Sequence, residues 1–143
     1  MQLKDIMTRD VEVIHPDIML EAAAARMDAL NVGSLPVCDG DRLLGVITDR
    51  DIVVRATAAG SDPKTTRVRD AMTTDVIYGY DDQDVTSAAR LMEEKQIRRL
   101  PVLNRGNRLV GIVSLGDLAV DTGNERLAGE ALKQISEPAE PEH

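Results

Sequence analysis

The stretch Gly45-Val46-Ile47-Thr48-Asp49-Arg50-Asp51 recurs 66 residues later as Gly111-Ile112-Val113-Ser114-Leu115-Gly116-Asp117. In both copies an apolar run ends at a hydroxyl residue, and an aspartate follows three positions further on. The apolar run predicts a buried strand, and a hydroxyl followed by an acid at the third position predicts that a helix begins there. The chain therefore contains the same strand-to-helix junction twice.

The repeat extends outward from this motif over most of the chain. At an offset of 65, and then 66 after one inserted residue, 16 of 44 compared pairs are identical, where chance predicts about three. The matched residues in the first copy include Asp5, Met7, Thr8, Asp10, Val11, Asp17, Ala23, Ala24, Met27, Leu35, Pro36 and Val37. A duplication explains these matches, and two similar halves usually pack about a pseudo-twofold axis.

Each half predicts the same series of elements, β-α-β-β-α. Hydrophobic periodicity and turn residues indicate a short strand, a helix, a hairpin that includes the Leu-Pro-Val segment, and a second helix. Asp84 is a candidate N-cap, whereas Gly33, Gly60 and Gly123 are candidate helix ends. The predicted ranges are 11–14 and 76–78 for the short strands, 19–30 and 85–95 for the first helices, 43–47 and 109–113 for the second hairpin strands, and 49–59 and 115–120 for the second helices.

The same pattern predicts the domain organisation. Residues 3–60 form the first repeat, 61–69 a linker, 70–121 the second repeat, 122–135 a C-terminal helix and 136–143 a disordered acidic tail. The C-terminal helix carries an apolar stripe that needs a partner, either the core of this chain or another subunit. The stripe consists of Leu127, Ala128, Ala131, Leu132 and Ile135.

Composition excludes several classes of function. The chain has 143 residues, a formal net charge of −8, two Tyr and neither Phe nor Trp, so it lacks both the positive charge and the aromatic platform for binding nucleic acids. Two His and one Cys provide no nucleophile–base pair and no metal cluster, so we expect no enzyme and no bound metal. Cys38 is expected to be a small buried apolar residue. No apolar run reaches the length of a signal peptide or a membrane span, which indicates a cytoplasmic protein.

The duplicated junction has two interpretations. A helix that begins at Thr48 or Ser114 presents backbone N–H groups to a phosphate, and Asp51 or Asp117 can accept two hydrogen bonds from the diol of a ribose. The alternative is a capping box, which needs no ligand. Both interpretations stay open at the level of the sequence.

Together the Asp-Ile-Met-Thr and Asp-Ala-Met-Thr openings, the two Leu-Pro-Val segments and the two Gly-to-Asp motifs resemble the cystathionine-β-synthase (CBS) domain family. The resemblance covers nearly all of residues 3–121, and two repeats in tandem resemble a Bateman module such as the stand-alone hypoxic-response proteins of actinobacteria. It implies a mixed α/β (α+β) fold with two three-stranded sheets packed together and helices outside. It also implies clefts that bind AMP, ADP, ATP, NAD or S-adenosylmethionine.

The resemblance further implies roles for individual residues. Asp51 and Asp117 would bind ribose, with Thr48 and Ser114 beside the ribose and phosphate, and Arg98 and Arg99 would bind phosphate. Arg50 would serve the cleft of the other repeat. The adenine walls would be Val11, Ile14, Leu35 and Pro36 in one cleft and Val76, Tyr78, Leu100 and Pro101 in the other. Because Arg98 and Arg99 replace Gly33 and Ser34 of the first repeat, we expect the Ser114/Asp117 cleft to bind more tightly.

These inferences predict a non-enzymatic regulatory module that senses an adenine nucleotide in a stress response. By the same resemblance it would form a homodimer through its helices and signal to an effector protein that the sequence does not identify. The alternative is a structural or protein-interaction module whose clefts stay empty.

Overall fold

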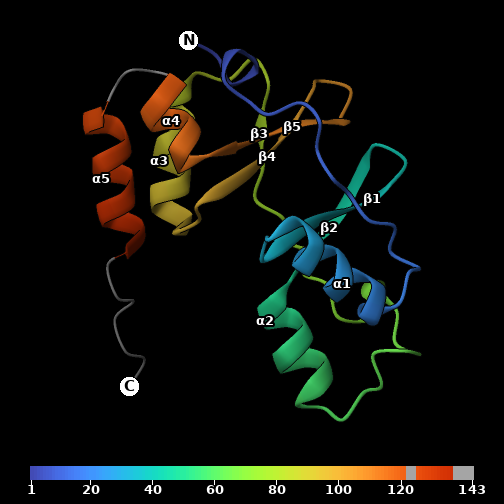
Figure 1. The fold of residues 1–143 in the computed structure, drawn as a ribbon. Helices are drawn as coiled ribbons and strands as arrows, with labels where there is room; N and C mark the ends of the chain where they lie inside the picture. Colours follow the sequence, from blue (N-terminus) through green and yellow to red (C-terminus); the bar gives the residue numbers. More distant parts are fainter. Residues whose placement is uncertain (122–124, 137–143) are drawn as a thin grey trace. The chain divides into compact units, whose positions relative to one another are not determined.

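The computed structural model describes residues 1–121 and 125–136 (Figure 1). Two short 3₁₀ turns, Leu3–Asp5 and Val68–Asp70, belong to the openings of the two repeats. The helices and strands are α1 (Leu20–Leu30), β1 (Ser34–Asp39), β2 (Arg42–Thr48), α2 (Asp49–Asp51) with a π-helical continuation over Ile52–Thr57, β3 (Gly79–Tyr80), α3 (Val85–Lys95), β4 (Arg99–Leu103), β5 (Leu109–Ser114), α4 (Leu115–Asp121) and α5 (Glu125–Ser136).

The chain divides into two compact units whose boundaries differ from those of the sequence repeats. Unit 1 comprises Met1–Val11 and the described residues from Ile77 onward, and unit 2 comprises Glu12–Val76. The opening of each repeat therefore packs with the body of the other repeat. Residues 61–69, expected to be a linker, lie inside unit 2, where Thr66 accepts a hydrogen bond from the Leu20 amide and Val68 is fully buried.

Unit 2 is built on an antiparallel hairpin of β1 and β2. The expected strand at 11–14 is reduced to one parallel bridge between Ile14 and Val37, so this sheet has two strands where three were expected. Pro16, two residues further on, has no backbone N–H with which to extend the pairing. The core consists of aliphatic side chains, among them Ile14, Leu20, Ala23, Met27, Leu35, Val37, Ile47 and Val68.

Unit 1 has a three-stranded sheet in the order β3-β4-β5, with β3 parallel to β4 and β4 antiparallel to β5. The strand expected at 76–78 lies instead at Gly79–Tyr80. A side chain at Gly79 would lie 2.9 Å from Leu3 and 3.0 Å from Leu100, so glycine allows the backbone to approach the core at this position. That core includes Leu3, Ile6, Met7, Ala88, Met92, Leu100, Val102, Val113 and Leu118.

The first helix of each repeat ends at the expected residue, Leu30 in α1 and Lys95 in α3, but the residue that terminates α1 is not the expected glycine. Asp84 caps α3 by accepting a hydrogen bond from the Thr86 amide, whereas Met19 provides no side-chain cap for α1. Both helices end at a left-handed residue, Asn31 with φ 54° and Gln96 with φ 53°. The expectation that Gly33 ends α1 was therefore wrong, because the short amide side chain of asparagine tolerates this conformation two residues earlier.

The second helix of the first repeat changes from α-helical to π-helical hydrogen bonding along its length. Its first turn, α2, is α-helical, and residues 52–57 continue with π-helical hydrogen bonds. Gly60 follows with φ 76°, as expected of a glycine at a helix end. In the second repeat α4 ends at Asp121, and Gly123 lies outside the described residues.

The C-terminal helix α5 packs against α3 and α4 within unit 1 (Figure 1). Ile135, one of the residues of the predicted stripe, packs against the core of the unit. Leu132 is 46% exposed, so α5 also presents apolar surface to solvent. Ser136 belongs to α5, and the remaining residues of the predicted acidic tail lie outside the described residues.

Candidate functional site

Each Gly-to-Asp motif begins with glycine because another segment of backbone lies against it. In unit 2, Thr73 and Val46 exchange two backbone hydrogen bonds of 2.9 Å, and a Cβ atom on Gly45 would lie 2.6 Å from the Thr73 carbonyl oxygen. In unit 1, Thr8 pairs with Ile112 in the same way, and a Cβ atom on Gly111 would lie 2.9 Å from the Thr8 carbonyl oxygen. The Met-Thr opening of one repeat is thus fastened to the motif of the other.

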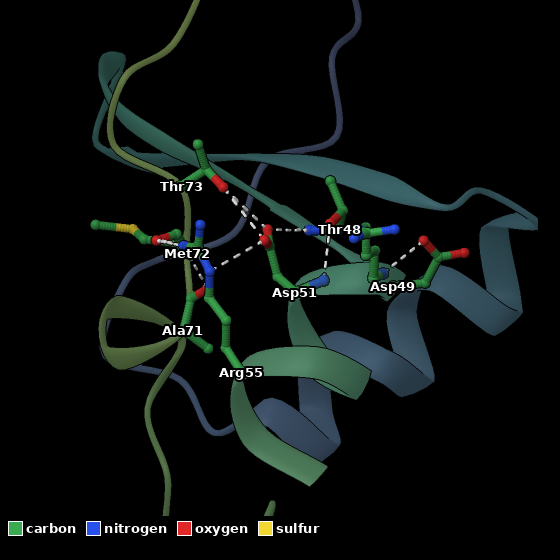
Figure 2. Close-up of polar contacts among 8 residues, drawn as sticks. Thr48, Asp49, Asp51, Arg55, Ala71, Met72 and Thr73 are labelled. Carbon is green, nitrogen blue, oxygen red and sulfur yellow. Dashed lines mark hydrogen bonds and ion pairs between the residues drawn. The ribbon is translucent and has the colours of Figure 1, made fainter. Parts of the chain in front are cut away.

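The hydroxyl and the aspartate of each motif form a capping box. The Thr48 amide donates to the Asp51 carboxylate and the Asp51 amide donates to the Thr48 hydroxyl, both at 3.0 Å (Figure 2). The Ser114 amide donates to Asp117 at 2.8 Å, and the Asp117 amide donates to Ser114 at 3.1 Å. The capping box is therefore present in both units. A ligand would have to use the hydrogen-bonding positions of the hydroxyl and the carboxylate that the box leaves unoccupied.

The backbone N–H groups expected to receive a phosphate are mostly occupied by the protein itself. In unit 2 the Asp49 amide donates to the Gly33 carbonyl and the Arg50 amide to the Asp49 carboxylate. In unit 1 the Leu115 amide donates to the Arg98 carbonyl, but the Gly116 amide has no acceptor in the described part of the chain. Leucine at 115 lacks the carboxylate that Asp49 provides, so unit 1 keeps one N–H group for a ligand.

Asp51 is surrounded by further donors that its counterpart lacks. It is 7% exposed, and its carboxylate accepts a hydrogen bond from the Thr73 hydroxyl at 3.2 Å (Figure 2). Arg55 Nε lies 3.7 Å from the same carboxylate, while its Nη1 donates to the carbonyls of Met72 and Ala71 at 2.9 Å and 3.4 Å. Sequence reasoning missed both Thr73 and Arg55, although an arginine four residues after a helical aspartate was a signal for Arg55.

Asp117 has a simpler environment. It is partly buried, and across the described residues its only side-chain partner is Ser114. The Thr8 hydroxyl, which corresponds to that of Thr73, makes no hydrogen bond to Asp117 within the same residues. The carboxylate of unit 1 therefore keeps acceptor capacity that Asp51 has already used.

The sheet of unit 1 places two arginines next to Ser114. Arg99 is the register partner of Ser114 across the β4–β5 pair, and the Arg98 carbonyl binds the first amide of α4. Both side chains are exposed, and neither guanidinium has an ion-pair partner in residues 1–121 and 125–136. In unit 2 the corresponding residues are Gly33 and Ser34, and the Asp49 carboxylate lies 3.0 Å from the Cβ position of Gly33. The two junctions thus differ in charge.

Most of the residues predicted to line adenine belong to the cores. Ile14, Leu35 and Leu100 are 6%, 3% and 0% exposed, and Pro36 and Pro101 are also buried. Val11 belongs to unit 1, whereas the residues predicted to line the same cleft, such as Ile14, belong to unit 2. Val76 likewise belongs to unit 2, whereas Tyr78 belongs to unit 1. Tyr78 is 40% exposed and its ring meets that of Tyr80 edge to face, with centroids 5.6 Å apart. Arg50, expected to reach the cleft of the other repeat, is an exposed residue of α2.

The described residues hold no cluster of three or more His, Cys, Asp or Glu side chains that could bind a metal ion. Among the same residues, no helix combines the length and the apolar character that crossing a membrane requires. Cys38 is 2% exposed, and burial raises the pKa of its thiol to about 11. Its thiol is therefore protonated at neutral pH and contributes as an apolar group.

Comparison with known proteins identifies relatives that match most of the chain. The CBS domain model matches residues 3–56 and 68–120. The CBS domain-containing protein YhcV of Bacillus subtilis is 43% identical over 134 residues, 94% of each protein. Hypoxic response protein 1 of Mycobacterium tuberculosis is 40% identical over 117 residues, 81% of each protein.

Solved structures agree with these relatives. The crystal structure of Hypoxic Response Protein I with two coordinated zinc ions has a TM-score of 0.76 at 39% identity and covers 83% of this chain and 97% of that one. The structure of CBSX2 in complex with AMP has a TM-score of 0.74 at 27% identity and covers 87% and 98%. The predicted resemblance is confirmed, and this chain belongs to the CBS domain family as a tandem pair of CBS domains.

Proposed function

We propose that this chain is a non-enzymatic regulatory module of the cytoplasm that binds an adenosine-containing ligand and reports its occupancy to a partner protein. The candidate ligands are AMP, ADP, ATP, NAD and S-adenosylmethionine. The observation that carries the proposal is the environment of Ser114 and Asp117 in unit 1, where polar groups of three kinds lie close together. The AMP complex of the relative CBSX2 supports the ligand class, and the hypoxic-response relatives support a role in a stress response.

The ribose would bind to Asp117. A carboxylate accepts two hydrogen bonds from a vicinal diol, and these charge-assisted bonds are stronger than those between neutral groups. The oxygen of Asp117 that bonds the Ser114 amide keeps its role as a cap, while the other oxygen has no hydrogen-bond donor among residues 1–121 and 125–136. The ligand would therefore add to the capping box rather than dismantle it.

The phosphate would bind to Arg98, Arg99 and the Gly116 amide. Guanidinium groups bind phosphate oxygens in a bidentate fashion, and both arginines are exposed beside Ser114. The same arginines repel the sulfonium of S-adenosylmethionine. We therefore expect unit 1 to prefer a phosphorylated adenosine over S-adenosylmethionine.

Exposed apolar side chains of unit 2 support association into a homodimer. Val53 and Val54 are 59% and 51% exposed and follow one another in the π-helical segment, and Leu30 at the end of α1 is 37% exposed. Burial of such residues against a second copy would remove apolar surface from water. Light scattering of Val53→Ser/Val54→Ser against the unchanged chain tests this part of the proposal.

A thermal-melt screen with the five candidate ligands tests the proposed function. At 100 times the dissociation constant a ligand adds about 2.7 kcal/mol, which for a chain of this size raises the melting temperature by roughly 5–10 °C. Asp117→Asn is expected to abolish the shift, and Arg98→Gln/Arg99→Gln to abolish it for phosphorylated ligands. Arg90→Gln is the matched control, since it removes an exposed arginine of α3 in the same unit.

Two outcomes separate the proposal from the structural alternative. A shift with one nucleotide that survives Arg90→Gln and disappears in Asp117→Asn identifies a ligand-binding module. No shift with any of the five ligands, in a protein whose unfolding is cooperative, favours an interaction module in which Ser114 and Asp117 only cap α4.

A further inference from the structure

In unit 2 three side chains form a closed set, here called the clasp: Asp51, Arg55 and Thr73. The Thr73 hydroxyl lies 3.2 Å and 3.4 Å from the two oxygens of the Asp51 carboxylate, and Arg55 Nε lies 3.7 Å from one of them (Figure 2). The Thr48 amide bonds the other oxygen at 3.0 Å. Both oxygens of this carboxylate are therefore engaged within the protein.

The clasp also fastens a segment of backbone. Arg55 binds the carbonyls of Ala71 and Met72, and the next residue, Thr73, is held by its hydroxyl and by two backbone bonds to Val46. The chain passes from unit 2 to unit 1 only a few residues later, at Val76. Asp51 thus anchors the last stretch of unit 2 before the chain leaves it.

A ribose diol at Asp51 would compete with these donors. Because the Asp51 side chain is only 9% exposed, a ligand can bond its carboxylate only after Thr73 and Arg55 have moved away. Each hydrogen bond to a charged group that is lost without replacement reduces affinity by about tenfold or more. The clasp therefore opposes ligand binding at Asp51 while it leaves the capping box unchanged.

Unit 1 lacks the clasp although it has the same motif. Thr8 corresponds to Thr73 and makes the same two backbone bonds, but within the described residues its hydroxyl does not bond Asp117. The position that corresponds to Arg55 is Asp121 in the sequence, so no cation is encoded there. Of the clasp residues, only the position of Arg55 differs between the repeats in sequence, because it is Asp121 in the second repeat.

We propose that the clasp keeps the first-repeat site closed, so that the chain binds one adenosine ligand, at Ser114 and Asp117, until the clasp opens. Opening the clasp frees Asp51 for a second ligand and releases the segment that leads into unit 1. This inference rests on the proposed function for its ligand, whereas the anchoring of residues 71–73 by the clasp holds without any ligand.

Equilibrium dialysis with AMP counts the sites. The full chain is expected to bind one AMP per chain, and Thr73→Val and Arg55→Met/Thr73→Val are expected to bind two, the second with affinity at least about tenfold above that of the closed site. Thr8→Val is the matched control, because it makes the same substitution at the corresponding position of unit 1, and it should still bind one. Asp51→Asn in the opened variant should return the count to one.

Amide hydrogen exchange without ligand tests the anchoring separately. In Arg55→Met/Thr73→Val, the amides of Val46 and residue 73 are expected to exchange about tenfold faster than in the unchanged chain. In the control Thr8→Val, the same two amides should exchange at the rate of the unchanged chain. Two AMP per unchanged chain, with one lost in Asp51→Asn, would overturn the closed site, as would a count of one in a folded, opened variant. If no protein of the series binds AMP, the proposed function and the gating both fail for this nucleotide, and unchanged exchange rates would overturn the anchoring as well.

Discussion

Gly45→Ala tests whether the Met-Thr opening of the second repeat is fastened to the motif of the first. A Cβ atom at this position would lie 2.6 Å from the Thr73 carbonyl oxygen, whereas ordinary van der Waals contact begins near 3.4 Å. The two segments must therefore separate by about 0.8 Å, which lengthens the two 2.9 Å bonds between Val46 and Thr73 beyond hydrogen-bond range.

The cost follows from these two bonds. Each contributes about 1 kcal/mol, and alanine returns about 0.6 kcal/mol by restricting the unfolded chain. The net loss of about 1.4 kcal/mol corresponds to a tenfold increase in the equilibrium constant for opening unit 2. Gly129→Ala is the control, because Gly129 lies in α5 with no heavy atom within 4 Å of its Cβ position, and the same substitution should stabilise a helix there.

Cys38 provides the assay, because it is the single cysteine of the chain and lies in β1 of unit 2. Its thiol is 2% exposed, so a thiol-specific disulfide reagent reacts only when the unit opens, and the rate of labelling follows the population of the open form. Gly45→Ala is expected to accelerate labelling about tenfold. A rate equal to that of the unchanged chain, or of Gly129→Ala, would refute the close approach of Thr73 to Gly45.

Three further outcomes are expected. Leu118→Ala removes a fully buried side chain of unit 1 and should lower the free energy of unfolding by about 2–5 kcal/mol, as measured by urea unfolding followed by tyrosine fluorescence. Leu132→Ala, at a 46% exposed position, should lower it by less than about 1 kcal/mol. The Arg105 guanidinium lowers the pKa of Asp82 below 3.8, so the stability of this pair is present above that pH and disappears as the pH falls through the lowered value; acid titration of Arg105→Gln should show a smaller loss. With its pKa raised to about 11, Cys38 should be labelled only slowly at pH 8 in the unchanged chain, through opening of unit 2, and rapid labelling would contradict its burial.

Local patterns in the sequence were sufficient for the parts of the fold that depend on neighbouring residues. The helices α1 and α3 were predicted to within a residue, and so were the second strands of the two hairpins, because periodicity and turn residues act over a few positions. The capping boxes at Thr48 and Ser114 follow from a spacing of three residues. The duplication identified the family, and it did so without any knowledge of tertiary contacts.

The shorter elements could not be placed in this way. The strand expected at 76–78 lies at Gly79–Tyr80, since its position depends on contacts of Gly79 with Leu3 and Leu100, which are distant in sequence. The left-handed end of α1 falls on Asn31 rather than Gly33, because several residue types tolerate that conformation and the packing of the helix selects one.

The sequence by itself determined that this chain is a pair of CBS domains with two hydroxyl–aspartate junctions, and that Arg98 and Arg99 have no arginine counterparts in the first repeat. Only the tertiary structure decided which repeat each Met-Thr opening joins, and that Asp51 is enclosed by Thr73 and Arg55 while the Asp117 carboxylate bonds only the Ser114 amide within the described residues. The physical reason is the range of the interactions: capping and periodicity connect residues a few positions apart, whereas Thr73 reaches Asp51 across 22 positions. Such a contact depends on the folded path of the chain, which no local pattern contains.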